Sequence, residues 1–213
     1  MIIGIDLSGP SNTADTVCTL FVGRGTALHL IDCLLGATDA DIVKLFAGLQ
    51  TAESCCVGLD APLSYNPGGG DRPADKDLRS RLMNAGLAPG SVMAPTMTRM
   101  AYLTLRGMSV ARLIESTGGG KVRLVEVHPV AALALGGAPI EAVASLKSDP
   151  AARQVLLRWL EGEELQGVCR QANPSDHYVA SCACALAAWK WSRGRASWLW
   201  PARPPYHPYD FSC

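Results

Sequence analysis

The sequence predicts a single α/β domain over residues 1–213, with a mixed five-stranded sheet (three antiparallel strands plus two parallel ones) flanked by helices. Three observations predict this class. Three apolar runs at the start of the chain are joined by short polar connections, which is typical of an antiparallel meander. A stretch with helical spacing then leads to a fourth apolar run, and a strand reached through a helix normally lies parallel to its neighbour. Hydrophobic residues make up 48% and charged residues 18% of the chain, as in globular proteins.

The N-terminal elements follow from local sequence patterns. The run MIIGIDL is apolar up to its aspartate and is followed by turn residues, which is typical of a buried strand. A glycine turn at 23–25 joins two further runs, and the stretch after residue 38 spaces its apolar residues as a helix does. We therefore expect strands at 1–7, 14–22 and 27–34, a helix at 39–49 and a fourth strand at 55–59.

The C-terminal half begins with a helical insertion. The glycine-rich stretch NPGGG opens this segment at 66–120, in which 73–84 and 96–115 have helical spacing. KVRLVEV is predicted as a fifth strand that Pro129 stops. For the rest we expect short helices at 130–135, 140–147 and 151–161, a long helix at 173–191 with Asn173 as N-cap and Pro174 at its first position, and an edge strand at 198–200.

The order of these elements matches the ribonuclease-H-like fold, in which strands one, four and five lie side by side. The predicted chain has three antiparallel strands, a helix, a fourth strand, the helical insertion after strand 4, a fifth strand and closing helices. The match concerns topology, so it says nothing by itself about activity.

Three carboxylates follow apolar strands: Asp6 after MIIGI, Asp60 after CVGL and Glu126 after VRLV. Ligand sites of open α/β sheets lie at the carboxyl ends of the strands, and neighbouring strands are about 4.8 Å apart. Like charges at that spacing repel one another, and a divalent cation removes the conflict. Oxygen ligands favour Mg²⁺ or Mn²⁺, and two such ions about 3.5–4 Å apart can hold both reacting oxygens of a phosphodiester. Each residue alone would equally suit a turn at the end of a strand.

A fourth carboxylate, Asp176, lies in the first turn of the closing helix, which should pack beside strand one. We expect it to complete the site, so that the metal ligands and catalytic carboxylates are Asp6, Asp60, Glu126 and Asp176. The alternative is a structural aspartate that interacts with the helix dipole. The adjoining His177 is interpreted as a surface side chain rather than a proton relay.

A basic segment runs from Arg72 to Arg112. It carries seven Lys and Arg residues against two Asp residues, about +5 in a chain whose net charge is zero. Either it faces an anion or its charges solvate helices. Arg72 and Arg79 follow the glycine loop and suit a phosphate-bearing substrate, because guanidinium forks match phosphate oxygens. The alternative is an ion pair with Asp75 or Asp77.

Two further residues are candidate substrate contacts. Thr96 follows a proline, where a helix N-cap is the alternative and the more common role. His128, beside Glu126, would either hydrogen-bond a ligating carboxylate or pack at the strand end. The aromatic run that ends in Trp198 and Trp200 favours core packing or a homodimer surface over base stacking.

Eight cysteines occur without a CxxC pair, which excludes the usual zinc spacing. Most lie in apolar or alanine-rich runs, where cysteine behaves as a small hydrophobe. The sequence contains no secretory signal and no apolar run of membrane-spanning length. We therefore expect a cytoplasmic protein without a membrane partner.

Ordered motifs over most of the chain resemble those of domain-of-unknown-function family 429, a group of predicted ribonuclease-H-like nucleases. The motifs are GIDLSG, GLDAPLSY, DRPADKDLR, VMAPTMTRM, LTLRGM, VEVHP and the final alanine-rich helix. The resemblance implies a ribonuclease-H-like fold and metal-dependent nuclease activity, with Asp6, Asp60 and Glu126 on the family's acidic positions. Family members usually carry His-Asp-x-x-Asp-Ala before this helix, whereas the chain has DHYVAS, with Ala180 at the aspartate of the Asp-Ala pair. Asp176 lies one helical turn earlier and would have to substitute for it.

The function expected from these residues is metal-dependent hydrolysis of nucleic acid, with Mg²⁺ or Mn²⁺ as cofactor. One alternative is nucleotide binding or phosphoryl transfer of the actin-like or sugar-kinase type, since Ser8 and the residues after it could form a phosphate-binding hairpin. Such kinases usually need two related halves, whereas 213 residues hold only one, and this argues against the alternative. Another alternative is a non-catalytic ribonuclease-H-like scaffold, which Ala180 favours. The sequence does not distinguish DNA from RNA as the substrate.

Overall fold

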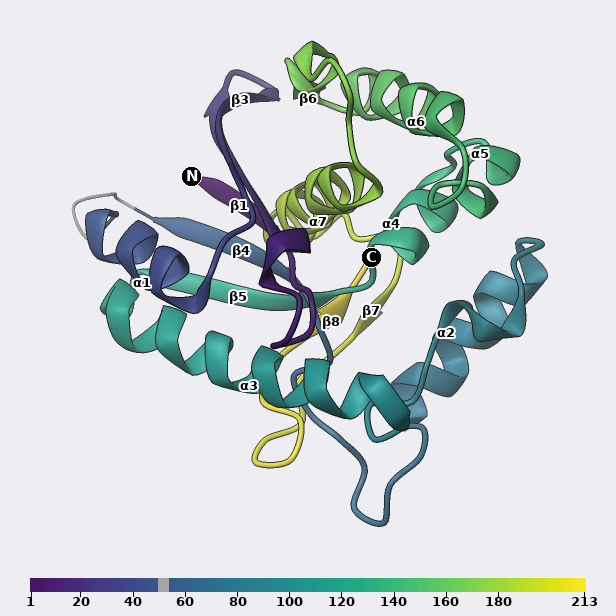
Figure 1. Ribbon diagram of the computed structural model, residues 1–213. Helices are drawn as coiled ribbons and strands as arrows, with labels where there is room; N and C mark the ends of the chain where they lie inside the picture. The colour runs from purple at the N-terminus through teal and green to yellow at the C-terminus, as the bar shows by residue number, and fades with distance from the viewer. Residues whose placement is uncertain (50–53) are drawn as a thin grey trace.

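One mixed sheet of eight strands crosses the molecule (Figure 1). The computed structural model describes residues 1–49 and 54–213. The strands are β1 (Ile2–Asp6), β2 (Val17–Arg24), β3 (Ala27–Leu35), β4 (Cys55–Asp60), β5 (Val122–Val127), β6 (Leu165–Gln166), β7 (Leu199–Trp200) and β8 (Phe211–Ser212). Their order in the sheet is β6-β3-β2-β1-β4-β5-β8-β7.

The expected number of five strands is wrong, because the sheet contains three additional strands, β6, β7 and β8. β7 coincides with the edge strand expected at 198–200, whereas β6 and β8 were not expected, because two residues are too short for an alternating pattern to show in the sequence. β6 extends the sheet beyond β3, and β8 and β7 extend it beyond β5. The predicted mixture is confirmed, since β1 to β3 pair antiparallel whereas β1, β4 and β5 are parallel neighbours.

The α-helices lie close to the predicted positions. They are α1 (Asp39–Gly48), α2 (Pro73–Asn84), α3 (Thr98–Gly118), α4 (Pro129–Gly136), α5 (Ile140–Ala144), α6 (Pro150–Gly162) and α7 (Asp176–Ser192). The predicted cap of α7 is wrong: Ser175, and not Asn173, is the N-cap, because its hydroxyl accepts the N–H of Tyr178 at 3.0 Å. Pro174 therefore precedes the helix.

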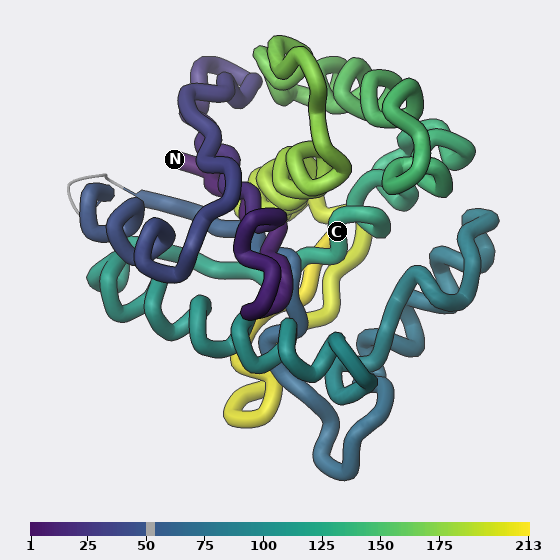
Figure 2. Tube along the Cα trace, viewed as in Figure 1, coloured from purple at the N-terminus to yellow at the C-terminus, as the bar shows by residue number. Residues whose placement is uncertain are grey.

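Helices cover both faces of the sheet (Figure 1). On one face α1 and α3 pack on alternate strand residues such as Ile3, Ile5 and Leu59. On the other face lies α7, with α4 and α6 packed beside it. The segment expected as a helical insertion therefore contributes α3 to a layer of the fold, whereas its other helix, α2, lies at the side of the molecule (Figure 1). The loop between β4 and α2 extends away from the sheet (Figure 2).

Two glycines let α7 approach the central strands closely. A Cβ atom on Gly4 of β1 would lie 1.9 Å from the carbonyl oxygen of Ser181, and one on Gly58 of β4 would lie 2.3 Å from that of Cys184. Gly4 and Gly58 are partners in the parallel pairing of β1 and β4. The start of α7 is thereby held over the carboxyl ends of these two strands.

The eight cysteines are free thiols, and burial raises the pKa of Cys18 and Cys55 to about 12. They are therefore protonated and act as packing residues. Within the described residues, no helix is both long enough and apolar enough to cross a bilayer.

Candidate functional site

Asp6 and Asp60 lie side by side at the carboxyl ends of β1 and β4, where the register pairs them directly. Both point to the α7 face, because they follow Gly4 and Gly58 by two residues. Asp6 is buried and Asp60 is half-buried. Burial, followed by the charge of Asp6, raises the pKa of Asp60 well above its usual range. We call these two residues the carboxylate pair.

His177 joins the carboxylate pair from the first turn of α7. Its Nδ1 lies 2.7 Å from Oδ2 of Asp6, and its Nε2 lies 3.6 Å from Oδ2 of Asp15. The hydrogen bond with Asp6 is the main cause that raises the pKa of His177. The interpretation of His177 as a surface side chain missed this contact. The available signal was its position at the start of the helix predicted to pack beside strand one.

Asp176 and Ala180 belong to the same end of α7. Asp176 is half-buried, Ala180 is buried one turn further on, and both line the cleft that contains the carboxylate pair. The position of Ala180 thus contributes a methyl group to the cleft. Asp176 is the acidic residue that α7 places there.

Glu126 points to the opposite face of the sheet. It pairs with Leu59 rather than with Asp60, and its neighbour Leu124 packs with the α1 and α3 layer. Both of its carboxylate oxygens have partners: Oε1 lies 2.5 Å from Nη2 of Arg72, and Oε2 accepts from Nη1 of Arg72 and from the N–H of Leu63, each at 2.9 Å. Glu126 reaches the edge of the cleft but is held by these donors.

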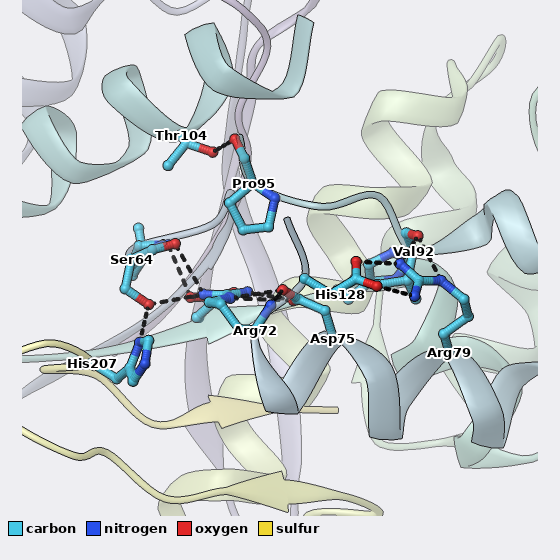
Figure 3. Close-up of polar contacts among 12 residues, drawn as sticks. Ser64, Arg72, Asp75, Arg79, Val92, Pro95, Thr104, His128 and His207 are labelled. Carbon is cyan, nitrogen blue, oxygen red and sulfur yellow. Dashed lines mark hydrogen bonds and ion pairs between the residues drawn. The ribbon is translucent and has the colours of Figure 1, made fainter. Parts of the chain in front are cut away.

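Arg72 lies at the centre of a buried network, between Ser64 and Asp75 (Figure 3). Its guanidinium donates to Asp75 at 2.8 Å from Nη2 and to the hydroxyl of Ser64 at 3.0 Å from Nη1, in addition to Glu126. The same hydroxyl lies 2.8 Å from Nδ1 of His207, which the C-terminal segment brings to this point. We call these five residues the Arg72 network. It joins α2, β5 and the C-terminal segment, and it leaves Arg72 committed to protein partners.

The other predicted substrate contacts also have partners within the protein. Arg79 forms a bidentate ion pair with Asp71, at 2.6 and 2.7 Å, and donates to the carbonyl of Val92 (Figure 3). Thr96 is not a helix N-cap, because Met97 holds that position before α3, and the hydroxyl of Thr96 accepts the N–H of Gly70 at 2.8 Å. These two residues fix the connections on either side of α2.

His128 is the N-cap of α4. Its Nδ1 accepts the N–H of Ala131 at 3.2 Å, and its Nε2 lies 2.8 Å from the carbonyl oxygen of Ser91. Burial lowers the pKa of His128, which favours the neutral ring that this pair of contacts requires. His128 lines the cleft but has no hydrogen bond to the carboxylate pair.

The residues present suit one divalent cation. In residues 1–49 and 54–213, no three His, Cys, Asp or Glu side chains are grouped so as to hold a metal ion among them. The carboxylate pair nevertheless offers oxygen donors, and Mg²⁺ is commonly held by one or two carboxylates together with water and substrate phosphates. Glu126 lies on the other face, so these side chains do not form a site of four carboxylates around two ions.

A comparison with known families gives one match. The sequence model described as "Protein of unknown function (DUF429)" matches residues 4–206. No curated protein and no solved structure matches the chain.

Proposed function

The chain belongs to the DUF429 family of proteins of unknown function, and we propose that it is a divalent-metal-dependent phosphodiesterase that acts on nucleic acid. The observation that carries this proposal is the carboxylate pair: Asp6 and Asp60 lie in direct register at the carboxyl ends of two parallel strands. Two aspartates in this position repel each other unless a cation or a proton lies between them.

The order of the elements supports a ribonuclease-H-like core. Strands β3, β2, β1, β4 and β5 are consecutive in the sheet, α1 and α3 cover one face, and α7 covers the other. Ligands of open α/β sheets bind at the carboxyl ends of the strands, which here are the ends of β1 and β4. The extra strands β6, β7 and β8 lie outside this core at the two edges.

In this proposal Asp6 and Asp60 hold a Mg²⁺ or Mn²⁺ ion, and Asp176 faces the same cleft from α7. When bound, such a cation polarises a phosphoryl group and activates water for attack. His177 orients Asp6 through the 2.7 Å hydrogen bond and is placed to take up or release a proton at the cleft. Arg72 holds Glu126 and thereby fixes the end of β5 beside β4.

The alternative of a phosphate-binding hairpin after β1 gains no support from the loop that follows this strand. The hydroxyl of Ser8 lies 2.8 Å from that of Thr16, and Arg106 donates to both at 3.2 and 2.9 Å. The polar groups of the loop are therefore used to attach it to α3.

Isothermal titration of Mn²⁺ into the metal-free protein tests the proposal. We expect binding at millimolar affinity or tighter in the wild type and its loss in Asp6→Asn and Asp60→Asn, because each variant removes one anionic donor. Asp32→Asn, which changes an exposed aspartate on β3, is the matched control and should bind as the wild type does. Glu126→Gln should also retain binding, since Glu126 is held by Arg72 on the other face.

Hydrolysis is then measured with a simple phosphodiester and with DNA and RNA oligonucleotides in Mn²⁺. Turnover that disappears in Asp6→Asn but not in Asp32→Asn would support the proposal. Equal Mn²⁺ affinity in the wild type and Asp6→Asn would refute a cation at the carboxylate pair. Cation binding without hydrolysis of any phosphodiester would favour the non-catalytic scaffold.

A further inference from the structure

The cleft over the carboxylate pair has apolar walls. Its volume is about 510 Å³, within the range of roughly 300–1,000 Å³ typical of small-molecule sites. The floor carries Asp6, Asp60 and His177. The walls rise from the connection between α2 and α3, from α3 itself and from α5, and their side chains include Leu87, Val92, Met93, Met100, Leu103 and Val143.

Two methionines of this wall, Met93 and Met100, are partly exposed, so a ligand in the cleft could contact them. Met93 is 42% exposed, Met100 is half-buried, and both line the cleft. Methionine is flexible and makes favourable contacts between its sulfur and aromatic rings. A flat ring therefore fits this wall better than a sugar or a charged group does.

Among the described residues that line the cleft, one side chain supplies free positive charge. Within the described lining, Arg72 and Lys147 are the Lys and Arg residues, and Arg72 is held in its network. Lys147 is exposed, forms no ion pair within the described residues, and lines the same cleft as Asp60. One free ammonium group suits one phosphate group.

The basic segment from Arg72 to Arg112 supplies no wider basic surface beside the cleft, because most of its charge is used within the protein. Four of its seven basic residues have carboxylate partners, namely Arg72, Arg79, Arg81 and Arg106. Binding to a long nucleic-acid strand depends on many phosphate contacts at once. The charge distribution therefore favours a ligand with a small number of phosphates.

We propose that the cleft takes one nucleotide unit, with its phosphate at Lys147 and the carboxylate pair and its base against Met93, Met100 and Leu103. This inference rests on the proposed function and names its substrate class. A free nucleoside monophosphate and the terminal nucleotide of a single strand share this chemistry, and the internal nucleotides of a duplex do not present it.

Fluorescence of 2-aminopurine tests the inference, because the base responds when it stacks in an apolar site. The probes are 2-aminopurine riboside monophosphate, a single-stranded decanucleotide with 2-aminopurine at its end, and a duplex with 2-aminopurine inside, each with Mn²⁺. We expect the monophosphate or the strand end to bind and the duplex to give no change. Whichever of the first two binds more tightly identifies the source of the nucleotide.

Matched variants assign the two parts of the site. Lys147→Gln should weaken monophosphate binding about tenfold or more and leave the unphosphorylated riboside unaffected, because it removes a charge-assisted contact. Lys44→Gln, on the exposed side of α1, is its control. Met93→Ser should weaken binding of the monophosphate and of the unphosphorylated riboside alike, each about fivefold. Met83→Ser is its control, since Met83 is 48% exposed and lies outside the cleft lining.

Tighter binding of the duplex than of the monophosphate, with no effect of Lys147→Gln or Met93→Ser, would overturn the inference. The Mn²⁺ titration separates this failure from that of the proposed function. Cation binding that depends on Asp6, without nucleotide binding, rejects the nucleotide pocket alone. Nucleotide binding that depends on Lys147 and Met93, without cation binding at Asp6, supports the pocket and rejects the proposed function.

Discussion

Glu126 and Asp60 carry the same charge at the ends of neighbouring strands, but the alternation of side chains gives them different partners. The sequence shows that each follows an apolar run, and this suggested a common site. It does not show that the register places Glu126 opposite Leu59, which directs its carboxylate to Arg72. Register depends on packing between distant segments, so the sequence alone could not assign the face on which Glu126 lies.

The Arg72 network should make a large contribution to stability. Arg72→Gln is expected to lower the free energy of unfolding by about 3–5 kcal/mol, because it leaves the buried carboxylates of Asp75 and Glu126 without their cation. Arg81→Gln, in the helix α2 whose N-cap is Arg72, is the matched control. The side chain of Arg81 is 54% exposed in its pair with Asp77, and its loss should cost less than about 1 kcal/mol. Urea denaturation measures both values, and equal losses would contradict the burial of the network.

His128 should make stability depend on pH. Its pKa is lowered in the folded protein, so as the pH falls through about 6.5 the unfolded chain binds a proton that the folded chain does not, and stability is lost. His128→Asn keeps a capping side chain for α4 and does not titrate. We expect the free energy of unfolding to fall more steeply for the wild type than for His128→Asn between about pH 7 and pH 5. Parallel curves would contradict a neutral, buried His128. The pKa of His177 is raised in both proteins, so its effect on the free energy of unfolding cancels in this comparison.

At the scale of elements, the contact between α7 and the strands β1 and β4 depends on the absence of side chains. Gly58→Ala should lower the free energy of unfolding by about 3 kcal/mol, because the added methyl group meets the backbone of Cys184 at 2.3 Å. Gly48→Ala is the control: the residue lies in α1, nothing approaches its Cβ position within 4 Å, and the change should stabilise by about 0.5 kcal/mol. Thermal denaturation would show opposite shifts of Tm for the two variants. A Tm of Gly58→Ala equal to that of the wild type would contradict the close packing.

The long elements could be predicted from the sequence because their signals are local. α2 begins at a proline in the first helical position and ends at Asn84, as its spacing indicates. The cap of α7 could not be assigned in the same way, since Asn173 and Ser175 are both good caps and only the structure decides between them. The contact of His177 with Asp6 required the packing of that helix, which is a long-range feature.

At the scale of the whole molecule, the C-terminal segment completes the sheet. β8 pairs with β5, the carbonyl of Asp210 accepts the N–H of Glu126 at 2.9 Å, and Phe211 packs edge-on against Trp198 at 5.0 Å. Removal of residues 197–213 should abolish cooperative unfolding and cause association, because it uncovers the edge of β5. Size-exclusion chromatography with light scattering measures the association. Tyr206→Ser, at a residue that is 70% exposed, is the control and should remain as the wild type. A monomeric, cooperatively folding truncated protein would contradict this role of β8.

The order of the long helices and strands followed from the sequence, whereas the partners of the charged side chains did not. The excess of basic residues from Arg72 to Arg112 suggested an anion-facing surface. The structure pairs Arg106 with Asp39 and Arg79 with Asp71, and both aspartates lie outside the segment whose charges were counted. A count of charges along a segment therefore does not describe the surface potential of the fold.

Both central strands carry the pattern Gly-x-Asp, as GID in β1 and GLD in β4, and the two copies lie in register. A slip of β4 by one residue would turn Asp60 towards the apolar layer of α1 and α3 and would push the side chain of Leu59 into the backbone of α7. Both consequences oppose the slip, one through desolvation of a charge and the other through collision. The Gly-x-Asp motif that forms the carboxylate pair thus also fixes the register of β1 and β4. The same residues that make the site destabilise sheets in which β4 is paired one residue out of register.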